Sequence, residues 1–372
     1  MISIIIPIYP PNEDPKHIEN MVKTILSYEG EKEVILRLEP FLNKDWEELI
    51  KKLSKYANVR IFVNPERYGK RKSCNEAAKT AKGKYLLFID ADVFLPSNRD
   101  FLKKIISALE KYDYLDIVKE LIPSNLFGKI MYYEYLGMNI FQYLSAKYLQ
   151  KLYTINGAFV AVKKDLFLKL GGFGKFIIED VEFATRLALN NKKATFLNLK
   201  IWIEPLESFK RWVDQRKRWA YGFAEYLKFY WKHLIKNFLK HKKDLSILIF
   251  MLIYNPAVLS FLIFFLIPQA IWLKISSLAL FLLSVKLTPI IYILIPLIEI
   301  ANFLKNIVLV ILAYTITAAI YYYFARKFNM KFNILYFTLY YFVYAPIWLL
   351  IVITVLIGYF IFEKEFKIDW KV

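Results

Sequence analysis

The sequence predicts an α/β domain with a mostly parallel sheet, followed by a C-terminal α-helical transmembrane module. Over the first 240 residues, short apolar runs of strand length alternate with segments of helical periodicity, a pattern typical of α/β domains. After residue 244 the apolar runs reach the roughly 20 residues that a membrane-spanning helix needs. The 372 residues therefore provide for one large domain and a membrane module.

Four apolar runs are expected to form strands, with helices between them. The expected strands are Ile2–Ile8, Glu33–Leu38, Val59–Val63 and Tyr85–Ile89. The expected helices are Pro15–Tyr28, Trp46–Tyr56 and Ser73–Ala81. Because ligands of such sheets bind at the carboxyl ends of the strands, the residues that follow Ile89 are expected to face a ligand.

The balance of charges points to a membrane surface. Lys and Arg number 52 against 33 Asp and Glu, a net charge of +19. Six lysines lie in residues 226–244, just before the first long apolar run, where they predict a basic amphipathic segment at the cytoplasmic interface. This position argues against a nucleic-acid partner. Cys74 is the only cysteine, which excludes a disulfide scaffold and a Cys-based zinc site.

Four long apolar runs follow: residues 245–273, 275–298, 307–325 and 334–362. The second carries Lys286 near its middle, where a Lys costs about 2.5–3.5 kcal/mol on insertion, so three or four spans are expected. Three spans would export the polar tail, residues 363–372, and four would place Arg326 outside, against the positive-inside rule. The side of the C-terminus therefore stays open.

The N-terminal domain is expected to be cytoplasmic and the protein to be integral to the cell membrane. The first apolar run, Ile2–Ile8, has strand length, and no basic segment precedes it, so we expect no secretory signal.

Asp90-Ala91-Asp92 follows directly after an apolar strand. Two carboxylates at this spacing can meet a divalent metal that already holds a diphosphate, because Mg²⁺ and Mn²⁺ often bridge protein carboxylates and substrate phosphates. The alternative is an ordinary polar exit from a strand.

Glu179-Asp180 opens a stretch with helical spacing, Val181–Leu189. Acidic residues are favoured at a helix N-terminus by the macrodipole. The functional alternative is a general base on a loop, placed to take a proton from an incoming hydroxyl.

Two basic segments offer contacts for an anionic ligand. Lys70 lies in a turn before a helix, where backbone N–H groups and a Lys can receive an anion. In the segment Gln215 to Trp219, Arg218 offers a planar fork for a diphosphate and Trp219 a flat face for a sugar ring. The alternatives are a solvated turn and the polar face of an interfacial helix.

In this order, these segments resemble the family 2 glycosyltransferases with a GT-A fold. The likeness is closest to the membrane-embedded group that contains hyaluronan, chitin and cellulose synthases and ceramide glucosyltransferase. It covers residues 1–225 and rests on Ile4–Pro7, Gly69-Lys70-Arg71 with Asn75, Asp90-Ala91-Asp92, Asn156–Phe159, Gly171-Gly172-Phe173, Glu179-Asp180, and Gln215 with Arg218-Trp219.

The resemblance implies an inverting transfer from a nucleotide-diphosphate sugar, expected to be a UDP-sugar, that depends on Mn²⁺ or Mg²⁺. It assigns general-base chemistry to Asp180 with Glu179, and the metal to Asp92 with Asp90. Donor contacts would come from Pro7, Glu39, Lys70, Asp90 and Asp92, and contacts to the acceptor or diphosphate from Gln215, Arg218 and Trp219. Glu39 stands where the family usually has Asp to hold the uracil.

Three functions remain open at this point. The first is transfer of one or a few sugars to a lipid-linked or saccharide acceptor. The second is a processive polysaccharide synthase, with self-association as an option. The third is a non-catalytic membrane transporter or scaffold.

Overall fold

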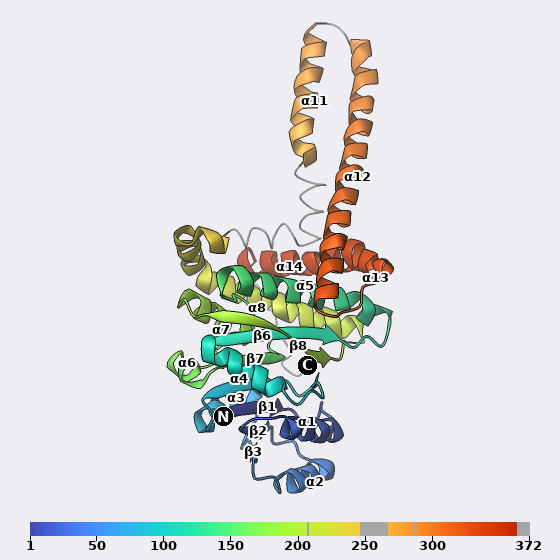
Figure 1. The fold of residues 1–372 in the computed structure, drawn as a ribbon. Coiled ribbons are helices and arrows are strands. Elements are labelled where there is room, and N and C mark those ends of the chain that lie inside the picture. Colours follow the sequence, from blue (N-terminus) through green and yellow to red (C-terminus); the bar gives the residue numbers. More distant parts are fainter. Residues whose placement is uncertain (207, 246–266, 286–287, 363–372) are drawn as a thin grey trace. The chain divides into compact units, whose positions relative to one another are not determined.

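The computed structural model describes residues 1–206, 208–245, 267–285 and 288–362 (Figure 1). Its contacts divide the chain into two units. The first unit comprises Met1–Asp244 and Ile351–Val372, and the second comprises Leu245–Leu350. The first unit contains all the residues that the sequence singles out for chemistry.

An eight-stranded sheet in the order β3-β2-β1-β4-β7-β6-β8-β5 forms the centre of the first unit. Strands β3, β2, β1 and β4 are parallel, and β6 is parallel to β8, whereas β7 runs antiparallel to β4 and β6, and β5 to β8. The strands are β1 (Ile2–Ile8), β2 (Lys32–Leu38), β3 (Val59–Val63), β4 (Tyr85–Ile89), β5 (Val93–Phe94), β6 (Tyr114–Leu121), β7 (Phe159–Lys163) and β8 (Ala194–Ile203).

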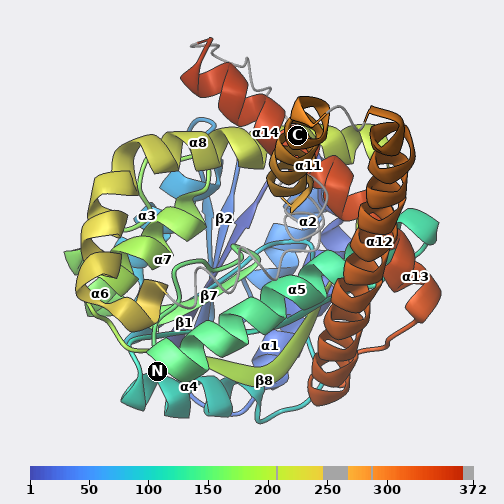
Figure 2. The same cartoon turned by 90° about the horizontal axis from the view of Figure 1, so that it is seen from above.

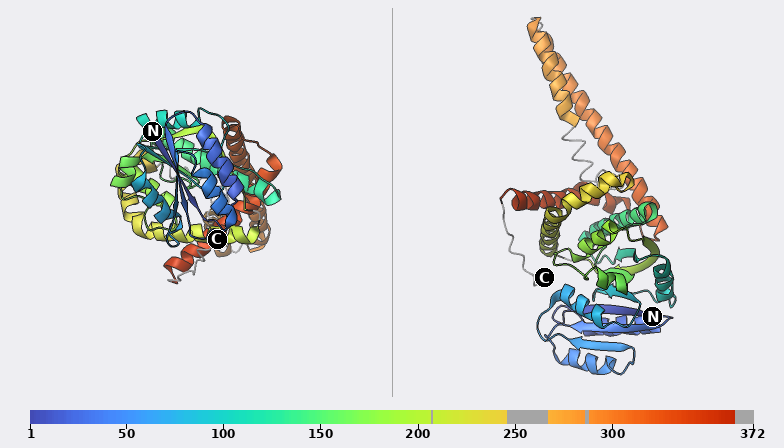
Figure 3. Two further views of the ribbon diagram at one scale, coloured as in Figure 1. Left: turned by 90° about the horizontal axis from the view of Figure 1, so that it is seen from below. Right: turned by 90° about the vertical axis from the view of Figure 1, so that its left-hand side faces the viewer.

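Helices lie on both faces of this sheet (Figure 3). Helix α3 packs on β1 and β2, and α5 packs on β6 and β8; Figure 2 shows α5 crossing the sheet and α8 curving past α7. The helices are α1 (Pro15–Ser27), α2 (Lys44–Leu53), α3 (Gly69–Thr80), α4 (Phe101–Lys111), α5 (Leu126–Leu149), α6 (Lys164–Lys169), α7 (Glu179–Leu189) and α8 (Phe209–Lys240).

The core explains why these apolar runs become strands. All five residues of β4 are buried, as are the first five of β1, because both strands are covered on two faces. The parallel register pairs Ile5 with Phe88 and Ile8 with Leu38. The segments after β1, β2 and β4 therefore leave the sheet at one edge, and these segments carry part of the candidate site.

The predicted α/β fold is confirmed, with some differences in the elements. The expected strands Ile2–Ile8, Val59–Val63 and Tyr85–Ile89 have the observed bounds, and α3 begins at Gly69, four residues before the expected start. Glu179 and Asp180 lie in the first turn of α7, which agrees with the helix N-terminus among the two alternatives and not with a position on a loop. Helix α8 continues through residue 225, where the sequence suggested a domain boundary.

The second unit is helical in the residues that the structure describes. Helix α11 (Ile267–Ser284) packs against α12 (Thr288–Lys327), and α13 (Ile334–Leu339) and the π-helical turn η2 (Tyr340–Tyr344) follow. Helix α14 (Ala345–Phe360) begins in this unit, and its residues from Ile351 onward belong to the first unit. Helix α12 is continuous through Pro296, so the expected break between the runs 275–298 and 307–325 is not present. Proline is tolerated inside membrane helices, where other groups satisfy the freed carbonyl.

Two described helices are long and apolar enough to cross a membrane: Phe303–Lys327 and Ile334–Phe360. This assignment rests on length and composition alone. Most of the expected span 245–273, together with Lys286 and the tail 363–372, lies outside the described residues.

Candidate active site

The candidate site begins where β4 ends, at Asp90-Ala91-Asp92. The Asp90 backbone N–H donates to the Ala158 carbonyl at 3.2 Å, which ties this turn to the segment before β7. The Asp92 side chain is solvent-exposed, but surrounding protein and the charge of Asp90 raise its pKa to about 6. The two carboxylates therefore repel each other at a strand end that is open to a ligand.

Glu39 holds the start of α3. Its carboxylate accepts the backbone N–H groups of Tyr68 and Gly69, both at 2.8 Å, and the Ser73 hydroxyl at 3.3 Å. The first N–H groups of a helix have no partner within the helix, so a buried carboxylate there stabilises the helix start. Glu39 thereby fixes the residue that follows Gly69, which is Lys70.

Lys70 connects three segments of the site. Its Nζ lies 2.6 Å from Asp90 Oδ1 and donates to the Gly157 carbonyl at 3.2 Å. Burial works against its charge, but the carboxylates of Asp90 and Glu179 outweigh this effect and raise the Lys70 pKa above its usual range. Lys70 is therefore a fixed cation in the middle of the acidic residues.

Asp180 joins this cluster through Gly157. The Gly157 backbone N–H donates to Asp180 Oδ2 at 2.6 Å, and the other oxygen accepts the Val181 N–H at 2.8 Å. Burial raises the pKa of Asp180, although Lys70 opposes the shift. Burial and the Asp180 charge raise the pKa of the neighbouring Glu179 to about 7. The pair is thus set to hold a proton near neutral pH.

Glu13 is an addition that the sequence analysis missed. Burial and the charges of Asp92, Asp90 and Glu204 raise its pKa to about 7. Glu13 lies five residues after β1, which is the neighbour of β4 in the sheet. Its position after an adjacent parallel strand was the signal that would have identified it.

The carboxylates after β4 could hold a divalent metal only if a bound substrate supplied further oxygen ligands. Among the described residues, no three His, Cys, Asp or Glu side chains are arranged to hold a metal ion. Lys70 Nζ lies within 2.8 Å of each Asp90 oxygen, whereas Asp92 is open to solvent. The fitting donor set is therefore Asp92, with Asp90 beside it and phosphate oxygens completing the shell, as is usual for Mg²⁺.

The basic motif of α8, residues 215–219, has its two arginines in different surroundings. Arg216 is fully buried, pairs with Glu134 of α5, donates to Gln215, and lies 4.1 Å from the Trp219 ring centre. Burial lowers the pKa of Arg218, and the charges of Glu179 and Asp180 oppose that shift. Arg218 therefore lies within electrostatic reach of the acidic pair, while Gln215 and Trp219 contact Arg216.

Pro7 is part of β1, where it pairs with Arg37 of β2. Strand β1 lies between β2 and β4 in the interior of the sheet, and the Pro7 ring has no group that could hydrogen-bond to Lys70, Asp90 or Asp180. Lys70, Asp90 and Asp180 are joined directly or through Gly157, and they come from three segments far apart in the sequence.

Comparison with known proteins finds a family that the N-terminal part of the chain matches. Residues 3–171 match the family described as Glycosyl transferase family 2. This segment is therefore similar to family 2 glycosyltransferase domains. It includes β1 to β7 and the residues Lys70, Asp90 and Asp92, while Asp180 and Arg218 lie beyond the matched range.

Curated relatives extend the similarity beyond this domain. A probable glycosyltransferase of Sulfolobus acidocaldarius is 25% identical over 288 residues, which cover 71% of this chain and 58% of that protein. The poly-beta-1,6-N-acetyl-D-glucosamine synthase of Staphylococcus aureus is 27% identical over 217 residues, which cover 56% of this chain and 52% of that protein. The chain thus spans little more than half the length of these relatives.

A solved structure shares the fold of this chain. The mannosyltransferase PcManGT from Pyrobaculum calidifontis, in complex with GDP-Man and Mn²⁺, superposes with a TM-score of 0.51 at 19% sequence identity. The match covers 82% of this chain and 86% of that one. At this identity the likeness shows a common fold.

Proposed function

We propose that the chain is a membrane-bound inverting glycosyltransferase that moves a sugar from a nucleotide-diphosphate sugar to a lipid-linked or saccharide hydroxyl. The observation that carries the proposal is the linkage of Asp90, Lys70, Gly157 and Asp180. It joins a carboxylate at a strand end, a fixed cation and a carboxylate with a raised pKa within one hydrogen-bonded group.

The residues divide the reaction between them. The acceptor oxygen forms a bond to the anomeric carbon from the face opposite the diphosphate, and the bond from that carbon to the diphosphate oxygen breaks. Asp180 takes the hydroxyl proton, a contribution typically worth about 10²–10⁴-fold in rate. Lys70 and Arg218 supply positive charge for the departing diphosphate. Glu179 places a second carboxylate beside Asp180, the proposed base.

Asp92, supported by Asp90, would hold Mn²⁺ or Mg²⁺. When bound, the metal supplies Lewis-acid neutralisation of the charge that develops on the diphosphate. The open Asp92 carboxylate beside a like charge supports this assignment, since a divalent cation relieves their repulsion.

The two apolar helices and the surface of α8 support a membrane location. Lys228, Lys232, Lys236 and Lys240 are exposed at a spacing of four residues, which places them along one stripe of the helix. Exposed apolar side chains with the same spacing run beside them: Trp231, Ile235 and Leu239. This pairing is typical of interfacial helices on anionic lipid. It favours a lipid-linked acceptor and a catalytic domain at the cytoplasmic face.

The second candidate is a processive polysaccharide synthase. The observation in its favour is the 27% identity to the Staphylococcus aureus poly-beta-1,6-N-acetyl-D-glucosamine synthase. An α/β domain followed by apolar helices is compatible with single transfer and with processive synthesis. Self-association of the chain would favour the processive synthase.

A donor screen tests the proposal. The full chain in membranes is incubated with labelled UDP- and GDP-sugars, Mn²⁺ or Mg²⁺, and lipid extract, and both nucleotide release and product size are measured. A single labelled glycolipid supports the leading function, and a ladder of products supports the processive one. No metal-dependent nucleotide release with any donor supports a non-catalytic transporter or scaffold.

A further inference from the structure

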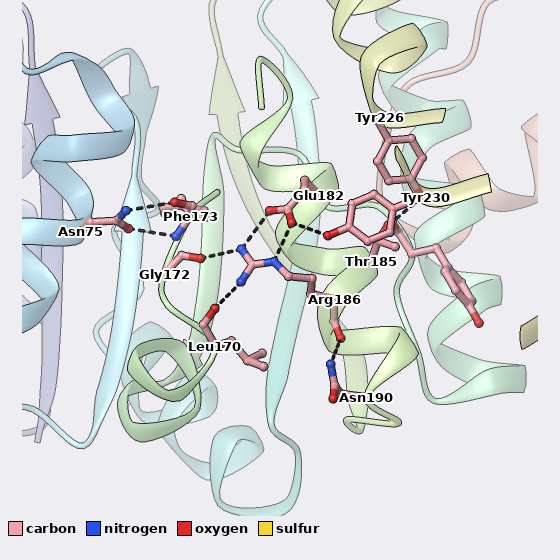
Figure 4. Close-up of polar contacts among 11 residues, drawn as sticks. Asn75, Leu170, Gly172, Phe173, Glu182, Thr185, Arg186, Asn190, Tyr226 and Tyr230 are labelled. Carbon is pink, nitrogen blue, oxygen red and sulfur yellow. Dashed lines mark hydrogen bonds and ion pairs between the residues drawn. The ribbon is translucent and has the colours of Figure 1, made fainter. Parts of the chain in front are cut away.

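The loop of residues 170–174 precedes the proposed catalytic pair and is bound from both sides by side chains (Figure 4). On one side, Asn75 of α3 accepts the Phe173 N–H at 2.9 Å and donates to the Phe173 carbonyl at 3.0 Å. On the other side, Arg186 of α7 donates to the Leu170 carbonyl and, at 2.6 Å, to the Gly172 carbonyl.

Arg186 is held in place by Glu182, one turn earlier on α7. Its Nε and Nη2 donate to the two Glu182 oxygens at 2.6 Å and 2.8 Å, a fork-to-fork pair that fixes the guanidinium plane. Glu182 is buried and also accepts the Tyr230 hydroxyl of α8 at 2.7 Å. The loop is therefore linked to α8 through one continuous polar network.

This network joins the two ends of the segment 170–186, which contains Asp180. Residues 170–172 lie before Asp180 and Arg186 lies after it, so one guanidinium fastens both ends of the segment. Gly171 and Gly172 have φ of +80° and +71°, and such residues have wide conformational freedom unless they are held. A Cβ on Gly174 would lie 2.6 Å from Glu182 Oε2, so the loop packs closely against the Glu182–Arg186 ion pair.

We infer that Arg186 is a positioning residue: it holds loop 170–174 on Glu182 and thereby fixes Asp180 for proton transfer. This inference rests on the proposed function. Lysine is a poor replacement, because it lacks the planar fork that serves a carboxylate and two carbonyls together. Tyr230 is the second anchor and acts through Glu182.

The test compares Arg186→Lys and Tyr230→Phe with the control variants Arg99→Lys and Tyr148→Phe, which change exposed side chains outside the network. Arg186→Lys is expected to lower kcat about 10–100-fold with the donor KM close to that of the parent, since a small misplacement of a catalytic group has a cost of this size. Tyr230→Phe is expected to give a smaller loss of the same kind, and the controls none.

Hydrogen exchange separates failure of this inference from failure of the proposed function. In Arg186→Lys, the amides of Gly172 and Phe173 are expected to exchange faster, while those of β1 and β4 keep their protection. This measurement stands even if the parent protein releases nucleotide from none of the donors. Unchanged exchange in the loop, an unchanged kcat, or an equal loss of protection throughout the sheet would overturn the inference.

Discussion

The Gly157 backbone N–H donates to Asp180 Oδ2 at 2.6 Å, and the Gly157 carbonyl accepts Lys70 Nζ at 3.2 Å. One peptide segment thus lies between the proposed base and the cation that pairs with Asp90. A Cβ on Gly157 would lie 2.8 Å from Asp180 Oδ2 and 3.0 Å from Lys70 Nζ. Glycine is required here because both charged groups approach its backbone closely.

Gly157→Ala is accordingly expected to lower kcat by about 10²-fold, because the added methyl displaces Asp180 from its N–H donor. Steady-state kinetics with a saturating donor measures this effect. Gly171→Ala serves as a comparison for backbone strain, since that position has positive φ but open space around its Cβ. Full activity in Gly157→Ala would show that the Asp180 position is not set by this contact.

Lys70→Met is expected to raise the donor KM by about 10–100-fold, since hydrogen bonds to charged groups contribute about 1.5–3 kcal/mol. Its loss also leaves Asp90 without a cation at 2.6 Å. Lys79→Met, on the exposed side of the same helix, is the control. Donor KM values measured at fixed metal concentration check the expectation, and equal values in the two variants would contradict it.

Glu39→Gln is expected to lower the thermal unfolding temperature, because an amide NH₂ meets N–H donors that the carboxylate now accepts. The sequence analysis assigned Glu39 to the nucleotide base, and this assignment stays a prediction. Thermal unfolding in detergent and donor KM, measured together, distinguish the two roles. A weaker donor affinity with unchanged stability would favour base recognition over support of α3.

The carboxylate pair predicts a pH dependence. Burial and mutual repulsion raise the pKa of Glu179 to about 7, so the pair retains a proton below that pH and loses it above. Because Asp180 must be ionised to accept a proton, kcat is expected to rise as the pH increases through about 7. In Glu179→Gln the neighbouring charge is gone, and the acidic limb is expected to move to lower pH. A profile of kcat against pH checks both, and identical limbs would contradict the coupling.

Much of the fold follows from local pattern. Ile2–Ile8 and Tyr85–Ile89 are continuous apolar runs, and strands buried on both faces require this composition. The antiparallel insertion of β7 between β4 and β6 could not be predicted in this way. Its pairing of Phe88 with Val160 joins residues 72 positions apart, and no local pattern determines such contacts.

The candidate site shows the same division. Asp90 and Asp180 are marked by their positions after a strand and at the start of a helix, so the sequence indicates them. Glu13 and Arg186 lie in segments that read as a polar loop and a helix face. Their partners, Asp92 and the Gly172 carbonyl, are brought to them only by the folded chain. Arg216 was passed over for Arg218 because only the structure shows which arginine is buried against Glu134.

The most direct test of the account measures nucleoside diphosphate release from the preferred nucleotide sugar by the parent chain and by Asp180→Asn. The parent is expected to release nucleotide only with Mn²⁺ or Mg²⁺ present. Asp180→Asn is expected to lose about 10²–10⁴-fold in kcat while it still binds the donor. Release by Asp180→Asn at the parental rate would contradict the assignment of this cluster as the catalytic site.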